Sequence, residues 1–71
     1  MSVYQIGIYN RHIRDKVRSG DDVDPVEAEW ENVHYFDIEA ESEQQAKDKI
    51  RLEYKESKGF VIDFIDIYKS F

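Results

Sequence analysis

The sequence has no cysteine and few residues that break regular structure: three glycines and one proline among 71 residues. Without cysteine there is no disulfide framework and no thiolate metal site. Three scattered glycines cannot build a glycine-rich phosphate loop. Aspartates such as Asp63 and Asp66 interrupt the longest apolar stretch, so no segment approaches the roughly 20 apolar residues of a membrane-spanning helix. These absences exclude a disulfide scaffold and a phosphate-binding loop, and they predict a soluble protein with no membrane partner.

The short length predicts a single domain over residues 1–71. A domain of this size buries only about 60% of the surface of its unfolded chain, which leaves one thin core and disfavours an elaborate enzyme. The first five residues have neither the basic region nor the long apolar run of a signal peptide. Together with the absence of cysteine, this predicts a cytoplasmic protein.

Three segments have the patterns of β-strands. Residues 3–10 and 33–40 alternate apolar and other side chains with period two, and the second of them has one wet face. Gly7 in the first segment indicates a bulge or a close neighbour on its face. Residues 60–68 are denser in apolar side chains, which predicts a strand covered on both faces and therefore central in the sheet or in contact with another molecule.

A helix is predicted between the second and third strands. Ser42 and Gln45 fit a capping box, in which the Ser42 hydroxyl accepts a hydrogen bond from the amide three residues later. Ala46, Ile50 and Tyr54 then repeat every four residues and form the buried stripe. Gly59 supplies a left-handed end to this helix.

The connection over residues 11–32 is too long to lack structure in so small a domain. Asp24, Pro25 and Glu27 have the pattern of a short helical start, with Val26 and Trp30 on a common face. Residues 11–18 either extend the first strand or form a helical turn. Trp30 is predicted to cover the core, with an exposed partner-binding anchor as the alternative.

These elements predict an α+β fold, with a small three-stranded sheet in the chain order β-β-α-β. One helix packs on one face of the sheet, and the connection between the first two strands contains a short helical turn. The first strand lies antiparallel beside or between the other two, because the second and third strands are joined through a helix.

The net charge of −6 is unevenly distributed along the chain. Residues 11–18 carry four basic groups and one acidic group, a net of +3, and residues 44–71 carry six basic and five acidic groups, a net of +1. Residues 19–43 carry ten acidic groups and no lysine or arginine, a net of −10. Such a segment repels nucleic acid and attracts basic partners; the alternative is a solvated face.

The resulting hypothesis is a non-enzymatic protein-interaction module that binds a basic protein, in its sharper form as an inhibitor or nucleic-acid mimic of the phage type. The expected partner-binding residues lie in the first half of the acidic segment: Asp21, Asp22, Asp24, Glu27, Glu29, Trp30 and Glu31. The alternatives are weak nucleic-acid binding through Arg11, Arg14, Lys16 and Arg18, and a structural domain with no discrete site. Homodimerisation through the sheet is a further hypothesis, because Tyr9, Tyr35 and the last strand could form a second apolar face.

Nothing in the sequence predicts catalysis, a metal or a cofactor. The spacing of Asp21, Asp22 and Asp24 does not match a calcium-binding loop. His12 and His34 are 22 residues apart with no cysteine to complete a zinc site, and His34 is expected to be a partly buried, satisfied side chain. No serine lies in the strand-turn-helix pattern of a catalytic nucleophile, so no enzymatic activity is expected.

Overall fold

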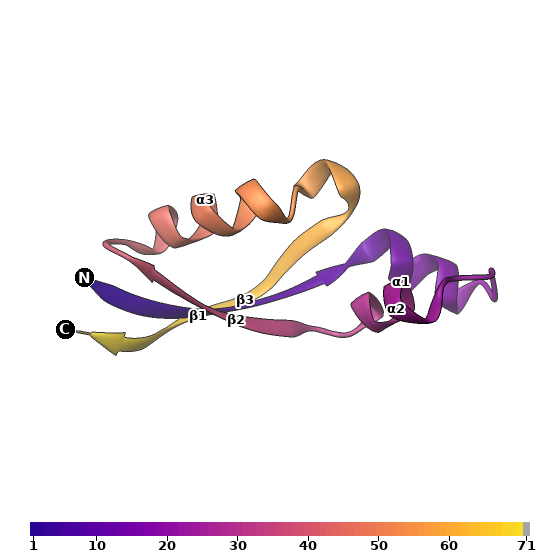
Figure 1. Cartoon of the computed structure of the whole chain (residues 1–71), viewed down its shortest axis with the longest axis horizontal. Helices are drawn as coiled ribbons and strands as arrows, with labels where there is room; N and C mark the ends of the chain where they lie inside the picture. The colour runs from indigo at the N-terminus through magenta and orange to yellow at the C-terminus, as the bar shows by residue number, and fades with distance from the viewer. Residues whose placement is uncertain (71) are drawn as a thin grey trace.

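The computed structural model describes residues 1–70. It has the predicted α+β fold, with three antiparallel strands and helices packed against them (Figure 1). In chain order the elements are β1 (Ser2–Asn10), α1 (Arg11–Arg18), α2 (Pro25–Ala28), η1 (Glu29–Glu31), β2 (His34–Ala40), α3 (Glu43–Glu53), η2 (Glu56–Lys58) and β3 (Phe60–Ser70).

Strand β1 is the centre of the sheet, whose order is β2-β1-β3. Both neighbours run antiparallel to β1, so β2 and β3 are parallel to each other, and α3 crosses over β1 to join them. The expectation that the last strand is central is therefore wrong. The apolar excess of β3 has another origin: Phe60, Ile62 and Ile65 pack against the core, whereas Ile67 is 51% exposed.

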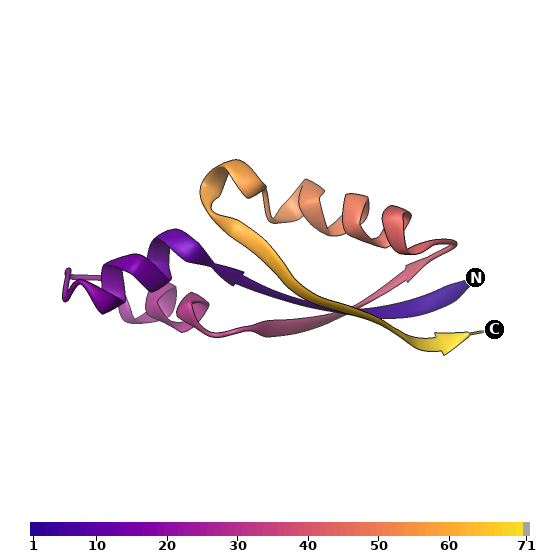
Figure 2. The same cartoon turned by 180° about the vertical axis from the view of Figure 1, so that it is seen from behind.

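The core lies between α3 and one face of the sheet. Ile6 and Ile8 of β1 are fully buried beneath Ala46 and Ile50 of α3, which confirms the predicted helical stripe. Phe36 and Ile38 of β2 extend this core, while the residues that alternate with them are exposed, as the wet-face pattern predicted. Figures 1 and 2 show α3 over this one face and no helix against the opposite face of the sheet, called the outer face below.

Helix α3 begins as predicted but ends early. The Ser42 hydroxyl accepts a hydrogen bond from the Gln45 amide at 3.1 Å. The Gln45 side-chain oxygen accepts from the Glu41 amide at 2.7 Å, one residue before the Ser42 amide that a standard capping box uses. Tyr54 leaves the helical conformation (φ −116°, ψ 85°) and packs its ring on Phe36 and Phe60. Gly59 is left-handed (φ 97°), but it ends the short turn η2 and not α3.

The long connection contains two helices before the η1 turn: residues 11–18 form α1, which confirms the helical alternative and not the extended strand, and α2 follows at the predicted start. Asn10 starts α1: its side-chain oxygen accepts hydrogen bonds from the amides of His12 at 3.0 Å and Ile13 at 3.1 Å. Its side-chain amide donates to the Lys58 carbonyl at 3.1 Å, and the Arg11 amide donates to the Gly59 carbonyl at 2.8 Å. Asn10 is 6% exposed, so this one buried polar residue ties the end of β1 to the turn before β3.

The outer face has a regular arrangement of side chains. Register places them in four rows across the strands, written in the order β2, β1, β3. The rows are Glu39, Val3, Lys69; Asp37, Gln5, Asp66; Tyr35, Gly7, Phe64; and the pair Tyr9, Val61, which Val33 adjoins from just before β2, with its side chain beside Gly7. The first two rows carry charge and the last two are apolar.

Gly7 has both features expected from the sequence, a bulge and a close neighbour. The register of β3 shifts between Gly7 and Ile8, and a side chain at position 7 would meet its neighbours. An added Cβ would lie 2.8 Å from Val33 Cγ1, 3.0 Å from Tyr35 Cε1 and 3.3 Å from Phe64 Cβ. The Tyr35 and Phe64 rings meet over this glycine edge to face, with centroids 6.0 Å apart.

We predict that Asn10→Ala lowers the free energy of unfolding by about 2 kcal/mol, because it removes a helix cap and leaves a part-buried carbonyl without its donor. Urea denaturation followed by circular dichroism measures this. Ser42→Ala removes only an exposed cap and should cost about 1 kcal/mol. Equal losses in the two variants would contradict the tie between β1 and the η2 turn.

We further predict that Gly7→Ala destabilises the fold by about 1–3 kcal/mol, because the added methyl group forces Val33 and Tyr35 to move. Gln5→Ala, on the same strand and face, should change the free energy of unfolding by no more than about 0.5 kcal/mol. Chemical denaturation of both variants tests this, and a Gly7→Ala protein as stable as the wild type would contradict it.

Candidate functional site

The acidic residues expected to bind a partner lie at the end of the molecule that carries α1 and α2. This set is called the acidic end and consists of the carboxylates of Asp21, Asp22, Asp24, Glu27, Glu29 and Glu31. All are exposed except Glu31, which is half-buried. Loop 19–24, α2 and η1 position them, and Asp24 starts α2 as predicted, since its carboxylate accepts a hydrogen bond from the Val26 amide at 2.9 Å.

The carboxylates of the acidic end have no ion-pair partner within the described residues. Across residues 1–70, none of the six forms an ion pair with a lysine, arginine or histidine side chain. The hydrogen bonds made by Glu29 and Glu31 use their backbone carbonyls and leave the carboxylates to solvent. The negative charge of this end is therefore available to an outside partner.

Trp30, named among the partner-binding residues, packs into the core beside the acidic end. Its ring stacks on His34 with centroids 4.4 Å apart, and it lies 5.4 Å from Tyr54 and 5.2 Å from Phe60. His34 Nε2 donates to the Glu29 carbonyl at 2.9 Å, so this histidine is half-buried and satisfied as expected. Val26 does not share the face of Trp30. The Val26 side chain is 73% exposed, whereas the Trp30 side chain, in the η1 turn, packs against the core.

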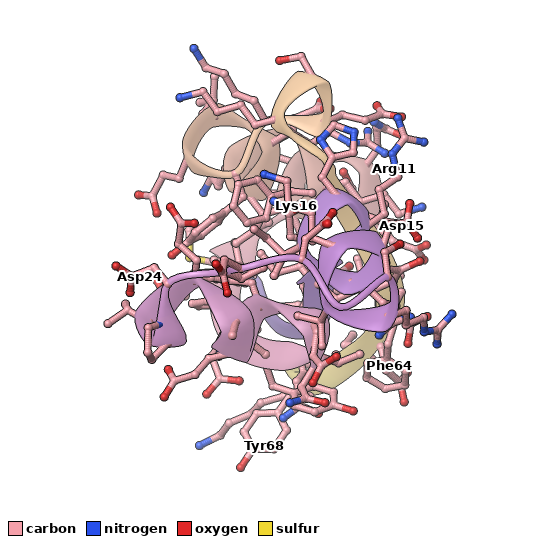
Figure 3. All side chains as sticks on the ribbon, turned by 90° about the vertical axis from the view of Figure 1, so that its right-hand side faces the viewer. Arg11, Asp15, Lys16, Asp24, Phe64 and Tyr68 are labelled. Carbon is pink, nitrogen blue, oxygen red and sulfur yellow. The ribbon has the colours of Figure 1, made fainter. Side chains whose placement is uncertain are left out.

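The basic residues of α1 do not gather on one surface. The Arg14 guanidinium lies over the Tyr9 ring, 3.7 Å from its centroid, and its Nε donates to the Glu31 carbonyl at 2.9 Å. Figure 3 shows Arg11 and Asp15 on one side of α1 and Lys16 on the other. Arg18 is exposed in the last turn of α1. In the same view Asp24 lies on the opposite side of this end from Arg11.

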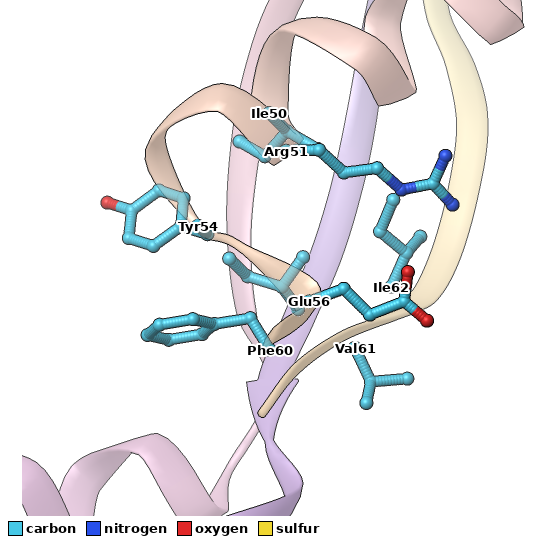
Figure 4. A pocket seen from close by; sticks show the side chains of 8 residues that line it. Ile50, Arg51, Tyr54, Glu56, Phe60, Val61 and Ile62 are labelled. Atoms are coloured by element: carbon cyan, nitrogen blue, oxygen red, sulfur yellow. The ribbon is translucent and has the colours of Figure 1, made fainter. Parts of the chain in front are cut away.

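A hollow of about 130 Å³ lies between the end of α3 and the start of β3. Apolar side chains of Ile8, Ile50, Ile62 and Phe60 line it together with the charged side chains of Arg51 and Glu56. Figure 4 shows the Arg51 and Glu56 side chains extending in the same direction past Ile62, away from Tyr54. This volume is below the roughly 300 Å³ at which small-molecule sites begin.

No group of three or more histidine, aspartate or glutamate side chains within residues 1–70 is arranged to hold a metal ion. Among the helices of the same residues, none has the length and apolar character to cross a membrane.

Comparison with known proteins gives no relative: no family model, no curated protein and no solved structure matches this chain. The candidate site therefore stands on its geometry alone.

Sequence reasoning missed two contacts that shape this end of the molecule. Asn10 was placed only as the last residue of a strand, although asparagine is among the preferred helix-capping residues and could have indicated that α1 begins there. The stacking of Arg14 on Tyr9 has no sequence signal of its own, because it requires β1 to end at Asn10 and α1 to begin at Arg11, which brings these two side chains together across the junction.

We predict that Trp30→Ala lowers the free energy of unfolding by about 3 kcal/mol, since it removes the ring that four aromatic side chains contact. Val26→Ala, four residues earlier and exposed, should change it by no more than about 0.5 kcal/mol. Thermal and urea denaturation measure both effects. A fully stable Trp30→Ala protein would contradict the assignment of Trp30 to the core.

Proposed function

We propose that this protein is a small, non-enzymatic interaction module of the cytoplasm whose acidic end binds a basic protein. The observation that carries the proposal is the set of six carboxylates without an ion pair inside residues 1–70, at one end of an elongated molecule. Unpaired charge of one sign steers a partner of opposite charge and speeds its association.

A partner of this end is most simply a protein that binds nucleic acid, because such proteins carry clustered lysine and arginine side chains for phosphates. The acidic end would then occupy the surface that phosphates otherwise contact, as a nucleic-acid mimic does. Trp30 contributes by holding the η1 turn against the core, so that the flanking Glu29 and Glu31 extend from a fixed backbone.

Nucleic-acid binding by this chain has less support. The basic side chains of α1 are dispersed: Arg14 lies over Tyr9 on the outer face, and Arg11 and Lys16 extend from different sides of α1. A phosphate backbone needs several cations along one track, and here the unpaired carboxylates of the neighbouring α2 and η1 would repel it. An enzymatic role has no support in the small hollow beside α3.

The test is affinity capture from cell extract with a charge-reversed variant and a matched control. Asp22→Lys, Glu27→Lys and Glu29→Lys together reverse three exposed residues of the acidic end. Glu41→Lys, Glu53→Lys and Glu56→Lys together make the same change of net charge elsewhere. We expect basic proteins captured at low salt to fall by about tenfold or more with the first variant, and to be retained with the second.

Capture is also expected to weaken as salt is raised, because the attraction is between exposed charges. Two outcomes would overturn the proposed function: the absence of any captured basic protein at low salt, or equal losses with both triple variants.

A further inference from the structure

The outer face of the sheet exposes the aromatic side chains of Tyr35 and Phe64, and within residues 1–70 no helix covers them (Figures 1 and 2). Tyr35 is 60% exposed and Phe64 is 39% exposed, and the half-buried Tyr9, Val33 and Val61 adjoin them. Together these five residues form the two apolar rows of the outer face. Apolar side chains that are contiguous on a sheet, unlike single exposed ones, mark an interface.

Charge is ordered along the strands on the same face. On one side of the apolar rows lies the row that contains Asp37 and Asp66. On the other side lies the Arg14 guanidinium, stacked over Tyr9 and bonded to the Glu31 carbonyl, close to where β2 begins. The first row along β1 carries one charge of each sign, on Glu39 and Lys69. From the next row onward the outer face is acidic, then apolar, then basic along the direction of β1.

When a second copy faces the first with its β1 strand in the opposite direction, the charges of the two outer faces are complementary. A two-fold axis in the plane of the face and across the strands would lay the apolar rows of two copies on each other. It would also place Asp37 and Asp66 of each copy near Arg14 of the other. A two-fold axis along the strands would bring Asp37 over Asp66 of the second copy, and like charges in such positions are destabilising. It would also bring Glu39 over Lys69 of the second copy, an attraction that offsets part of this repulsion. The axis across the strands is favoured because it brings the two aspartates to Arg14 without a matching repulsion.

We propose that the outer face is a homodimer interface in which two copies pack face to face with their β1 strands antiparallel. Tyr35 and Phe64 of the two copies form the apolar centre of the interface. At each end of the interface, Asp37 and Asp66 of one copy approach Arg14 of the other. This attraction sets the relative orientation of the two copies.

The size of the face predicts a weak dimer. Three strands about 4.8 Å apart and four rows about 6.7 Å apart cover about 400 Å² per copy, half of the roughly 800 Å² that each partner contributes to a standard interface. We therefore expect a weak dimer that is a monomer at low concentration.

The open edge of β3 is a poorer surface for a second copy than the outer face. Its register is interrupted at Asp63 and Tyr68, which stand opposite no residue of β1, and such bulges hinder pairing with another strand. The Asp66 side chain accepts a hydrogen bond from the Ile67 amide at 2.8 Å, which occupies a donor that a new strand would need. The edge is thereby protected in the manner of natural edge strands.

The experiment is sedimentation equilibrium up to about millimolar concentration. Its key variant is Asp37→Lys, an exposed residue with no side-chain contact to lose within residues 1–70. In the proposed arrangement the new lysine faces Arg14 of the other copy, and dimerisation should weaken about tenfold. In the alternative orientation it faces Asp66 of the other copy, and dimerisation should strengthen.

Three further variants complete the test. Tyr35→Lys should abolish the dimer, with circular dichroism confirming that the protein is folded. Glu53→Lys on α3 makes the same charge change away from the face and should leave dimerisation unchanged. Ile67→Lys alters the β3 edge and should also leave it unchanged.

A protein that remains monomeric at all concentrations overturns the proposal. So does an Asp37→Lys dimer as strong as or stronger than the wild type, or a dimer lost in Ile67→Lys but retained in Tyr35→Lys. The result is independent of the proposed function, because the capture experiment changes only acidic-end residues and the control positions Glu41, Glu53 and Glu56, while this interface uses Asp37, Tyr35 and Arg14.

Discussion

The structure depends on one constraint: β1 lies between two strands that are both antiparallel to it, and those two strands are joined by a single helix. The connection has to cross β1, and it can cover only one face as it does so. The core consequently forms on that face, where Ile6 and Ile8 of the central strand are fully buried beneath α3. The other face has no helix against it, and its side chains must be polar, pair among themselves or meet another molecule.

The end of the sheet next to α1 and α2 is closed by two kinds of contact, because a thin core cannot hold the connections by itself. At the end remote from the capping box of α3, the Trp30 ring packs on His34, Phe36, Tyr54 and Phe60 and joins β2, η1, the end of α3 and the start of β3. Asn10 adds three hydrogen bonds that turn β1 into α1 and hold the η2 turn. The aromatic and amide contacts together fix the backbone from which the acidic residues extend.

The molecule consequently offers two surfaces with different chemistry. The acidic end is charged, lies on short helical turns and suits a basic partner through electrostatic steering. The outer face is apolar at its centre, with opposite charges on either side, and suits a second copy of itself. The Arg14 side chain extends from α1 to the outer face. Its hydrogen bond to the Glu31 carbonyl connects the outer face to the acidic end.

The sequence by itself determined the local elements, because capping, periodicity and turn chemistry act over a few residues. The strands, the Ser42 cap, the Ala46 and Ile50 stripe and the left-handed Gly59 follow from such short-range rules. The charge of residues 19–43 and its separation from residues 11–18 were also present in the sequence alone.

Tertiary structure decided what depends on contacts between distant segments. It placed β1 and not β3 in the centre, ended α3 at Glu53 by drawing Tyr54 into the aromatic cluster, and turned Trp30 inward and Val26 outward. It also distributed the charges over the surface, because the direction in which a side chain extends depends on how its element packs on the sheet.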